Sequence, residues 1–294
     1  MIAVDWGSSS LRAYRLDEDG TILDQRRADL GALSCDGRFA DVLAHQIDGW
    51  DDTHVMMCGM VGGRGGWKEV PYVACPAGVR EIAGAIVALD ASTTVLAGRD
   101  LRIVPGMIDQ DSQMMADVMR GEETQIVGLL DSLGAGTHTI CLPGTHSKWA
   151  RVSDGTIRSI HTAMTGEAYA LLRTHSVLAK LMSANDPSFD ATAFDRGLQR
   201  SGETGGLLHH LFGVRTAGLL GRLSDTESPS YLSGLLIGHE IRAQTPHPQR
   251  VHLVGNERLL TIYARALEAF AIEVTRHPED LAAFGLHRLA RLAA

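Results

Sequence analysis

The segment Ile2–Leu16, with the sequence IAVDWGSSSLRAYRL, decides how the N-terminal part of this chain folds. Ile2-Ala3-Val4 predicts a buried strand, and the apolar alternation from Leu11 to Leu16 predicts a second strand. Asp5 ends the first strand and is followed, after a tryptophan, by one glycine and three serines, whose backbone N–H groups and hydroxyls can approach a phosphate closely. Taken alone, however, such a segment is better explained as an ordinary serine-rich β-turn.

The same order of elements recurs in the second half of the chain. The tetrapeptide Asp-Gly-Thr-Ile occurs at 19–22 and again at 154–157, and each copy follows a strand, a turn rich in small residues and another strand. The second of these turns, Gly144–Lys148, carries hydroxyl, imidazole and ammonium groups in the position of a second phosphate-binding turn. Two domains with the same arrangement of strands and turns would explain the repetition. We therefore predict an α/β protein with helices over mixed sheets and with domains at 1–125 and 126–294.

Composition excludes several classes of protein. The 294 residues carry a formal charge of −8, which argues against a nucleic-acid partner. No apolar run approaches the roughly 18 residues of a membrane span, and no signal-peptide pattern follows Met1. The four cysteines are scattered without metal-like spacing and are expected to be reduced thiols, and His209 and His210 are expected to be an exposed helical pair. We expect a cytoplasmic protein with neither a nucleic-acid nor a membrane partner, and nothing in the sequence argues for or against a homo-oligomer.

Further segments, taken in chain order, resemble those of a known family. They are Asp5–Ser8 with Arg12, Gly59–Gly62 with Gly66-Trp67, Val118–Gln125, Pro143–Trp149, Met164–Glu167 and Leu232–Gly238. Together they resemble the 2-dehydro-3-deoxygalactonokinase family of the sugar kinase/actin-like superfamily. The resemblance implies two ribonuclease H-like domains, with ATP and substrate in the cleft between them.

The same resemblance implies an ATP-dependent sugar-acid kinase, a phosphotransferase with an alcohol group as acceptor. It would phosphorylate 2-dehydro-3-deoxy-D-galactonate at the terminal 6-hydroxyl and feed galactonate catabolism, with ATP and Mg²⁺ as cofactors. A kinase for another hexose or 2-keto-3-deoxy sugar acid is the alternative, as is a non-enzymatic sugar-sensing protein of the same fold. A nicotinamide dehydrogenase is disfavoured because no G-x-G-x-x-G follows the first strand.

The resemblance also implies an ATP site built from both halves of the chain. Asp5 would bind Mg²⁺ through water, because hard cations prefer carboxylate and water oxygens. Gly255 and Asn256, at the start of a predicted helix from Glu257, would meet adenosine or the α-phosphate. The outer phosphates would be held by Gly7, Ser8, Ser9 and Ser10 from the first half and by Gly144, Thr145, His146 and Lys148 from the second.

The resemblance to sugar kinases further implies that a carboxylate just before the second half acts as the general base. Glu122 is the first candidate and Asp117 the second, because a carboxylate near the acceptor can take the hydroxyl proton late in a loose transition state. Asp109 and Asp111 compete with them. Paired glutamates at a helix start are also typical of a solvated first turn that suits the helix dipole, so that alternative stays open.

A glycine-rich loop, Gly59–Lys68, is the candidate substrate site. Its glycines let backbone N–H groups approach a carboxylate or hydroxyls, and a strand end of this kind is where ligands of open α/β sheets collect. The alternative is a flexible surface loop with its tryptophan in the core. Arg12 would bind phosphate or the substrate carboxylate, or would only be a cation at the sheet edge, and Glu167 would orient a sugar hydroxyl or only cap a helix. The candidate substrate residues are Arg12, Gly62, Gly63, Arg64, Trp67 and Glu167.

Overall fold

The protein is described by a computed structural model that covers residues 1–110, 115–185, 187–244 and 247–293. Its residues group into two compact units. Unit 1 contains Met1–Ile140, Trp149–His161 and Pro278–Ala294, and unit 2 contains Cys141–Lys148 and Thr162–His277. The predicted limit between residues 125 and 126 falls inside helix α3 (Glu122–Leu133), and the two predicted domains stay a prediction.

A six-stranded sheet of order β3-β2-β1-β4-β8-β7 forms the centre of unit 1. The predicted N-terminal meander is confirmed, since β1 pairs antiparallel with β2 and places Asp5 opposite Arg12. On its other side β1 runs parallel to β4, so Asp5 lies beside Cys58. The strands are β1 (Ile2–Trp6), β2 (Leu11–Leu16), β3 (Ile22–Ala28), β4 (His54–Gly59), β7 (Val87–Leu89) and β8 (Asp100–Ile103).

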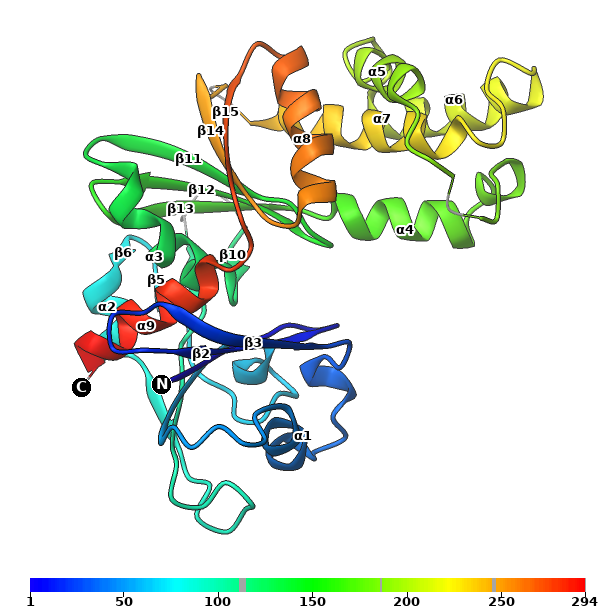
Figure 1. The fold of residues 1–294 in the computed structure, drawn as a ribbon. Helices are drawn as coiled ribbons and strands as arrows, with labels where there is room; N and C mark the ends of the chain where they lie inside the picture. Colours follow the sequence, from blue (N-terminus) through cyan, green and yellow to red (C-terminus); the bar gives the residue numbers. More distant parts are fainter. Residues whose placement is uncertain (111–114, 186, 245–246, 294) are drawn as a thin grey trace. The chain divides into compact units, whose positions relative to one another are not determined.

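Every residue of β1 is buried, because helices cover both faces of the strands around it. Figure 1 shows α1 (Phe39–Gln46) and α9 (Leu281–Ala293) on opposite faces of these strands. Phe39 and Leu43 of α1 join Val4 and Trp6 in one apolar cluster. A continuous apolar strand such as β1 is typical of a sheet covered on both sides.

Helices α3 and α9 approach so closely that only glycine fits where they cross. A Cβ added to Gly128 would lie 2.2 Å from the carbonyl oxygen of Leu281, and one added to Gly285 would lie 1.9 Å from that of Thr124. The backbones are therefore in direct contact. The smaller elements of unit 1 are η1 (Ala32–Ser34), η2 (Met60–Gly62), β6 (Ala77–Gly78), α2 (Val79–Gly84) and a three-stranded sheet of order β10-β9-β5, with β5 (Val73–Ala74), β9 (Met107–Asp109) and β10 (Asp117–Met119).

The predicted second strand–turn–strand segment is confirmed as β11 (Thr137–Leu142), β12 (Ser147–Ser153) and β13 (Thr156–Ala163). The repeated Asp-Gly-Thr-Ile has the same structural role in both copies, since each Asp-Gly forms the tight turn that leads into the third strand. Gly20 and Gly155 both have positive φ, +86° and +74°. Asp-Gly is favoured in such turns because glycine adopts positive φ without steric cost.

Unit 2 is mainly helical. Its helices α5 and α7 touch through glycines, because a Cβ on Gly197 would lie 2.1 Å from the Tyr231 carbonyl oxygen and one on Gly234 2.0 Å from that of Phe194. Strands β14 and β15 pair in parallel. In the part of the chain that the structure describes, no helix combines the length and apolarity needed to cross a membrane. The elements are α4 (Thr165–His175), η3 (Ala179–Leu181), α5 (Ala191–Arg200), α6 (Gly206–Leu219), α7 (Ser228–Ala243), β14 (Arg250–Val254), α8 (Glu257–Ala269) and β15 (Glu273–His277).

One expectation about α6 is wrong. His209 is exposed, but His210 is completely buried, with its Nδ1 3.0 Å from Nε2 of His239 and its Nε2 3.1 Å from the carbonyl oxygen of Thr204. Neighbouring positions on a helix point about 100° apart, so one of two adjacent histidines can face the protein while the other faces water.

Candidate functional site

Asp5 is the centre of the candidate site on unit 1. Its side chain is buried at the end of β1, and its Oδ2 lies 3.0 Å from Nη2 of Arg12. Arg12 also meets Glu279, with 2.6 Å between Nη1 and Oε2. Burial raises the pKa of Asp5, and the Arg12 charge opposes that shift. Arg12 is therefore shared between two carboxylates, and its guanidinium is engaged within the site.

Three backbone segments meet around this carboxylate. Gly59 ends β4 with φ +90°, and a Cβ there would lie 2.7 Å from the carbonyl oxygen of Trp6. Gly121 precedes α3 with φ +110°, and a Cβ there would lie 3.2 Å from Cα of Gly59 and 3.9 Å from Oδ1 of Asp5. Cys58 donates to the same oxygen at 3.9 Å, and burial raises the pKa of its thiol. Glycine is required at both positions because a side chain would displace the neighbouring backbone.

The serine turn lies immediately after this carboxylate. It is closed by a hydrogen bond from the N–H of Gly7 to the carbonyl oxygen of Ser10, 2.9 Å long. Ser8 and Ser9 are exposed. The backbone of Ser8 is packed against Gly31, where a Cβ would lie 1.7 Å from the Ser8 carbonyl oxygen. The turn is thus supported from one side while its serine side chains reach solvent.

Among its described residues, unit 1 offers Mg²⁺ the buried carboxylate of Asp5 rather than a complete set of protein ligands. Asp5 Oδ2 is buried and forms an ion pair with Arg12, but it has no hydrogen-bond partner. Over the described ranges, no cluster of three His, Cys, Asp or Glu side chains could hold a metal ion. Mg²⁺ is commonly held by one or two carboxylates together with waters and substrate phosphates. The residues present therefore fit an ion held mainly by phosphate oxygens and water, with Asp5 as the nearby carboxylate.

Glu122 and Glu123 begin α3 and face different environments. Glu123 is fully buried and accepts hydrogen bonds from the N–H of Gly121 at 2.7 Å and the hydroxyl of Thr124 at 2.9 Å. Burial, followed by the charge of Glu122, raises the pKa of Glu123 to about 8. Glu122 is half-buried, and its Oε2 accepts the backbone N–H of Arg120 at 3.0 Å. Of the pair, Glu122 is the one with access to solvent.

The candidate phosphate loop of unit 2 has two exposed side chains followed by two buried ones. Thr145 and His146 are exposed, whereas Lys148 is buried and its Nζ donates to Oγ1 of Thr162 at 3.0 Å. His146 forms a short contact with Glu167 through Nε2 and Oε2. A Cβ on Gly166 would lie 2.3 Å from the Gly144 carbonyl oxygen, so the first turn of α4 rests directly on the loop.

A buried hydrogen-bond chain ties this loop to two helices. Ser147 Oγ lies 2.8 Å from the hydroxyl of Tyr263, and that hydroxyl donates to Oε2 of Glu240 at 2.8 Å. All three side chains are buried. Burial raises the pKa of Tyr263 well above its usual value, so its hydroxyl keeps the proton that it donates. Helices α7 and α8 therefore fix the position of the loop between β11 and β12.

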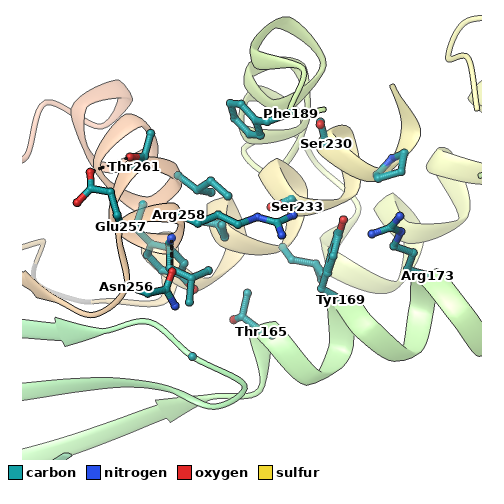
Figure 2. Close-up of a pocket in the computed structure, with 18 of the residues that line it drawn as sticks. Thr165, Tyr169, Arg173, Phe189, Ser230, Ser233, Asn256, Glu257, Arg258 and Thr261 are labelled. Carbon is teal, nitrogen blue, oxygen red and sulfur yellow. Dashed lines mark hydrogen bonds between the residues drawn. The ribbon is translucent and has the colours of Figure 1, made fainter. Parts of the chain in front are cut away.

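Beside this loop, unit 2 contains a cavity of about 670 Å³. Figure 2 shows Thr165, Tyr169 and Arg173 along α4 on one side and Asn256, Arg258 and Thr261 from α8 on another. Asn256 caps α8, because its Oδ1 accepts the N–H of Leu259 at 3.0 Å. Cavities of 300 to 1,000 Å³ with apolar walls and a few polar groups are typical of small-molecule sites. The apolar walls include Tyr169, Phe189, Leu236, Ile237, Leu259 and Ile262.

Comparison with known proteins decides the family. The profile of the family described as 2-keto-3-deoxy-galactonokinase matches residues 5–289. A probable 2-dehydro-3-deoxygalactonokinase of Rhizobium meliloti (strain 1021) is 38% identical, with 98% of this chain and 96% of that protein covered. The 2-dehydro-3-deoxygalactonokinase of Escherichia coli (strain K12) is 35% identical, with 96% and 94% covered. The chain belongs to the 2-keto-3-deoxy-galactonokinase family.

A structure assigned to the 2-keto-3-deoxy-galactonokinase family also matches the fold. The crystal structure of a protein assigned as a 2-dehydro-3-deoxygalactonokinase from Sinorhizobium meliloti superposes with a TM-score of 0.89 at 37% identity, covering 99% of this chain and 98% of that one. The predicted α/β fold of the sugar kinase/actin-like type is confirmed.

Several site residues predicted from the family resemblance have local partners in the structure. Trp67 stacks on Phe39, with ring centroids 5.9 Å apart, and packs against the core of unit 1. Glu167 contacts His146 on the phosphate loop and lies in a different unit from the glycine-rich loop. Asp109, a competitor for the base, accepts the N–H of Ile160 at 2.9 Å, and Asp111 lies outside the described residues. The roles assigned to these residues stay predictions.

The structure gathers the remaining predicted residues into two groups, one on each unit. Unit 1 holds Asp5, Gly7, Ser8, Ser9, Ser10, Arg12, Gly62, Gly63, Arg64, Asp117 and Glu122, and unit 2 holds Gly144, Thr145, His146, Lys148, Gly255 and Asn256. Sequence reasoning missed the cavity walls on α4, α7 and α8, because apolar side chains carry no chemical signature until the helices are packed. It also passed over Arg120, although this residue lies in Val118–Gln125, one of the segments on which the predicted family resemblance rests.

Proposed function

We propose that this chain transfers the γ-phosphoryl group of ATP to the terminal 6-hydroxyl of 2-dehydro-3-deoxy-D-galactonate. The observation that carries the proposal is the buried Asp5, held next to the exposed serine turn in a member of this kinase family. Family membership favours a kinase over the sugar-sensing alternative. The proposal places the enzyme in the cytoplasm, where ATP is available, with the nucleotide and the sugar acid as its partners.

ATP is proposed to bind with its nucleoside in the cavity of unit 2 and its phosphates at the loop Gly144–Lys148. The cavity volume and apolar walls suit a base and ribose, and Asn256 lies on its rim. Lys148 brings a buried ammonium that donates to the neutral hydroxyl of Thr162, so its charge is available to a phosphate oxygen. The exposed serine turn of unit 1 is proposed to contact the outer phosphates. Mg²⁺, when bound near Asp5, would neutralise charge on these phosphates.

Glu122 is proposed to accept the proton of the attacking hydroxyl. Glu122 directly follows Gly121, whose backbone lies close to the Asp5 carboxylate, and the Glu122 side chain is half-buried. Phosphoryl transfer proceeds through a loose transition state, so the base is needed late and an ordinary carboxylate suffices. The acceptor is proposed to lie on the glycine-rich loop that follows β4, where Gly62, Gly63, Arg64 and Trp67 are its candidate contacts. The serine turn and Lys148 then hold the phosphoryl group in line with the hydroxyl.

A substrate panel tests the proposal. ADP formation from Mg²⁺ and ATP is measured with the 2-keto-3-deoxy acids derived from galactonate and from gluconate, and with simple hexoses. We expect turnover with the galactonate-derived acid, and phosphate on its 6-oxygen by NMR. Asp5→Asn serves as the matched inactive variant, with kcat reduced about 100-fold or more, because the site loses the charge that complements the metal and the phosphates. Turnover of hexoses alone would reject the proposed acceptor.

A further inference from the structure

Arg120 is partly buried, and its guanidinium has no ion-pair partner among the described residues. Nε and Nη1 are both shielded from solvent and have no hydrogen-bond partner. Only Nη2 is bonded, to the carbonyl oxygen of Val70 at 2.8 Å. Among the residues that the structure describes, no carboxylate forms an ion pair with this guanidinium. Buried polar groups are nearly always paired, and an unpaired buried cation is costly, so this arrangement calls for a functional explanation.

The guanidinium is held in a fixed place beside the candidate substrate loop. The central carbon of the guanidinium, Cζ, lies 4.2 Å from the ring centre of Tyr72, so the aromatic ring packs against one face of the guanidinium. A Cβ on Gly62 would lie 3.2 Å from Nη1 of Arg120, and a Cβ on Gly63 would lie 3.5 Å from Cδ of Arg120. The glycine loop therefore covers the guanidinium with backbone alone. A side chain at Gly62 would crowd Nη1 of Arg120 and the side chain of Ile103, whereas one at Gly63 would make ordinary contact with Cδ of Arg120.

Met60 also packs beside Gly63. The methyl group of Met60 lies 3.0 Å from the Cβ position of Gly63. Methionine is unbranched and adapts its conformation readily. An anionic group that reaches Nε and Nη1 of Arg120 would meet N–H donors shielded from water, where a charge contact is stronger than in solvent.

We propose that Arg120 is the cation that selects the carboxylate end of the acceptor, at the Gly62–Gly63 backbone. The inference rests on the proposed function, whose acceptor carries one carboxylate that a simple hexose lacks. Arg120 is then a specificity-determining residue: the acid is bound by a charge-assisted hydrogen bond, and an uncharged analogue leaves the guanidinium unpaired. Arg64, exposed on the same loop, is the competing cation that the sequence favours.

The test compares the acid with its primary amide, in which an uncharged carboxamide replaces the carboxylate. The KM of the acid and the KI of the amide as its competitor are measured for wild type, Arg120→Gln, Arg120→Lys and Arg64→Gln. We expect Arg120→Gln to raise the KM of the acid about 10- to 100-fold, as the loss of a charge-assisted hydrogen bond implies. The KI of the amide should stay near its wild-type value, and Arg120→Lys should keep part of the preference for the acid. The KM for ATP and circular dichroism verify that each variant is folded.

Two results would overturn the inference while leaving the proposed function intact. In the first, Arg120→Gln weakens the binding of the acid and of the amide equally, which would mean that Arg120 only supports the structure of the loop. In the second, Arg64→Gln abolishes the preference for the acid and Arg120→Gln does not. Wild-type protein that fails to phosphorylate the acid would instead reject the proposed function, and the inference with it.

Discussion

At the scale of single residues, adjacent glutamates have opposite properties because a helix turns between them. Glu123 faces the interior, where burial keeps its carboxyl protonated into the neutral range, and Glu122 faces outward. The sequence alone does not distinguish these two adjacent glutamates. Their surroundings differ: Glu123 is bonded to Gly121 beside Asp5, whereas the half-buried Glu122 is the residue proposed as the base.

The base assignment is tested by two isosteric changes. Glu122→Gln should lower kcat by about 100- to 10,000-fold, the usual contribution of a general base. Asp117→Asn should leave kcat nearly unchanged, since Asp117 lies on the short strand β10 and its Oδ1 accepts the N–H of Val118. Steady-state kinetics with saturating ATP measure both. A near-normal kcat in Glu122→Gln would remove Glu122 as the base, and a large loss in Asp117→Asn would move the role there.

Buried Glu123 should make stability depend on pH. Its pKa is raised from 4.5 to about 8 on folding, so the folded state binds the proton more tightly than the unfolded chain does. This stabilisation is fully present below the unfolded pKa and is lost as pH rises toward the folded value. Glu123→Gln mimics the protonated acid and cannot ionise, so its stability should not decrease with pH for this reason.

Urea denaturation of wild type and Glu123→Gln between pH 4.5 and 8 measures the effect. The stability of wild type relative to the variant should fall by at least about 1.4 kcal/mol across this range, the equivalent of one pKa unit. A constant difference between the two proteins would show that folding does not shift the pKa of Glu123.

At the scale of elements, glycines control how helices cross. Gly234 of α7 touches the backbone of α5, whereas a Cβ at Gly213, inside α6, would meet no atom within 4 Å. The same reasoning applies to Gly128 and Gly285, whose contact fixes α9 against α3. The residues just before α9 include Glu279, which reaches Arg12 in the site.

This contrast predicts opposite effects for one substitution. Gly234→Ala should destabilise the protein by about 1–3 kcal/mol or more, because a methyl group is forced into backbone atoms. Gly213→Ala, the matched control, should be neutral or stabilising by up to about 1 kcal/mol, because alanine favours the helix. Thermal unfolding followed by circular dichroism measures both. Equal shifts for the two variants would contradict the close approach of α5 and α7.

At the scale of the whole molecule, the proposed reaction assigns ATP mainly to residues of unit 2 and the acceptor to residues of unit 1. Transfer requires the phosphoryl group and the hydroxyl to come within bonding reach and water to be kept away. Many kinases meet this requirement by closing around their ligands.

We therefore expect a smaller radius of gyration, by solution scattering, when a non-hydrolysable ATP analogue and the sugar acid are both present with Mg²⁺. Each ligand added alone is the control and should give a smaller change. No change with both ligands bound would contradict ligand-driven closure.

The sequence by itself determined the parts of this protein that depend on local chemistry. The N-terminal meander, the two Asp-Gly turns and the helix that begins after Asn256 follow from apolar periodicity, the positive φ of glycine and side-chain capping, all of which act over a few residues. The family followed from motifs in a fixed order.

Only the tertiary structure decided the features that depend on residues far apart in the chain. It joined Arg12 to Glu279, and it buried His210 and Glu123. It assembled the cavity from three helices and the segments beside them, and it left Arg120 beside Gly62 with no ion-pair partner among the described residues. Burial and charge pairing are properties of a packed environment, and a residue acquires them only when distant segments are brought into contact.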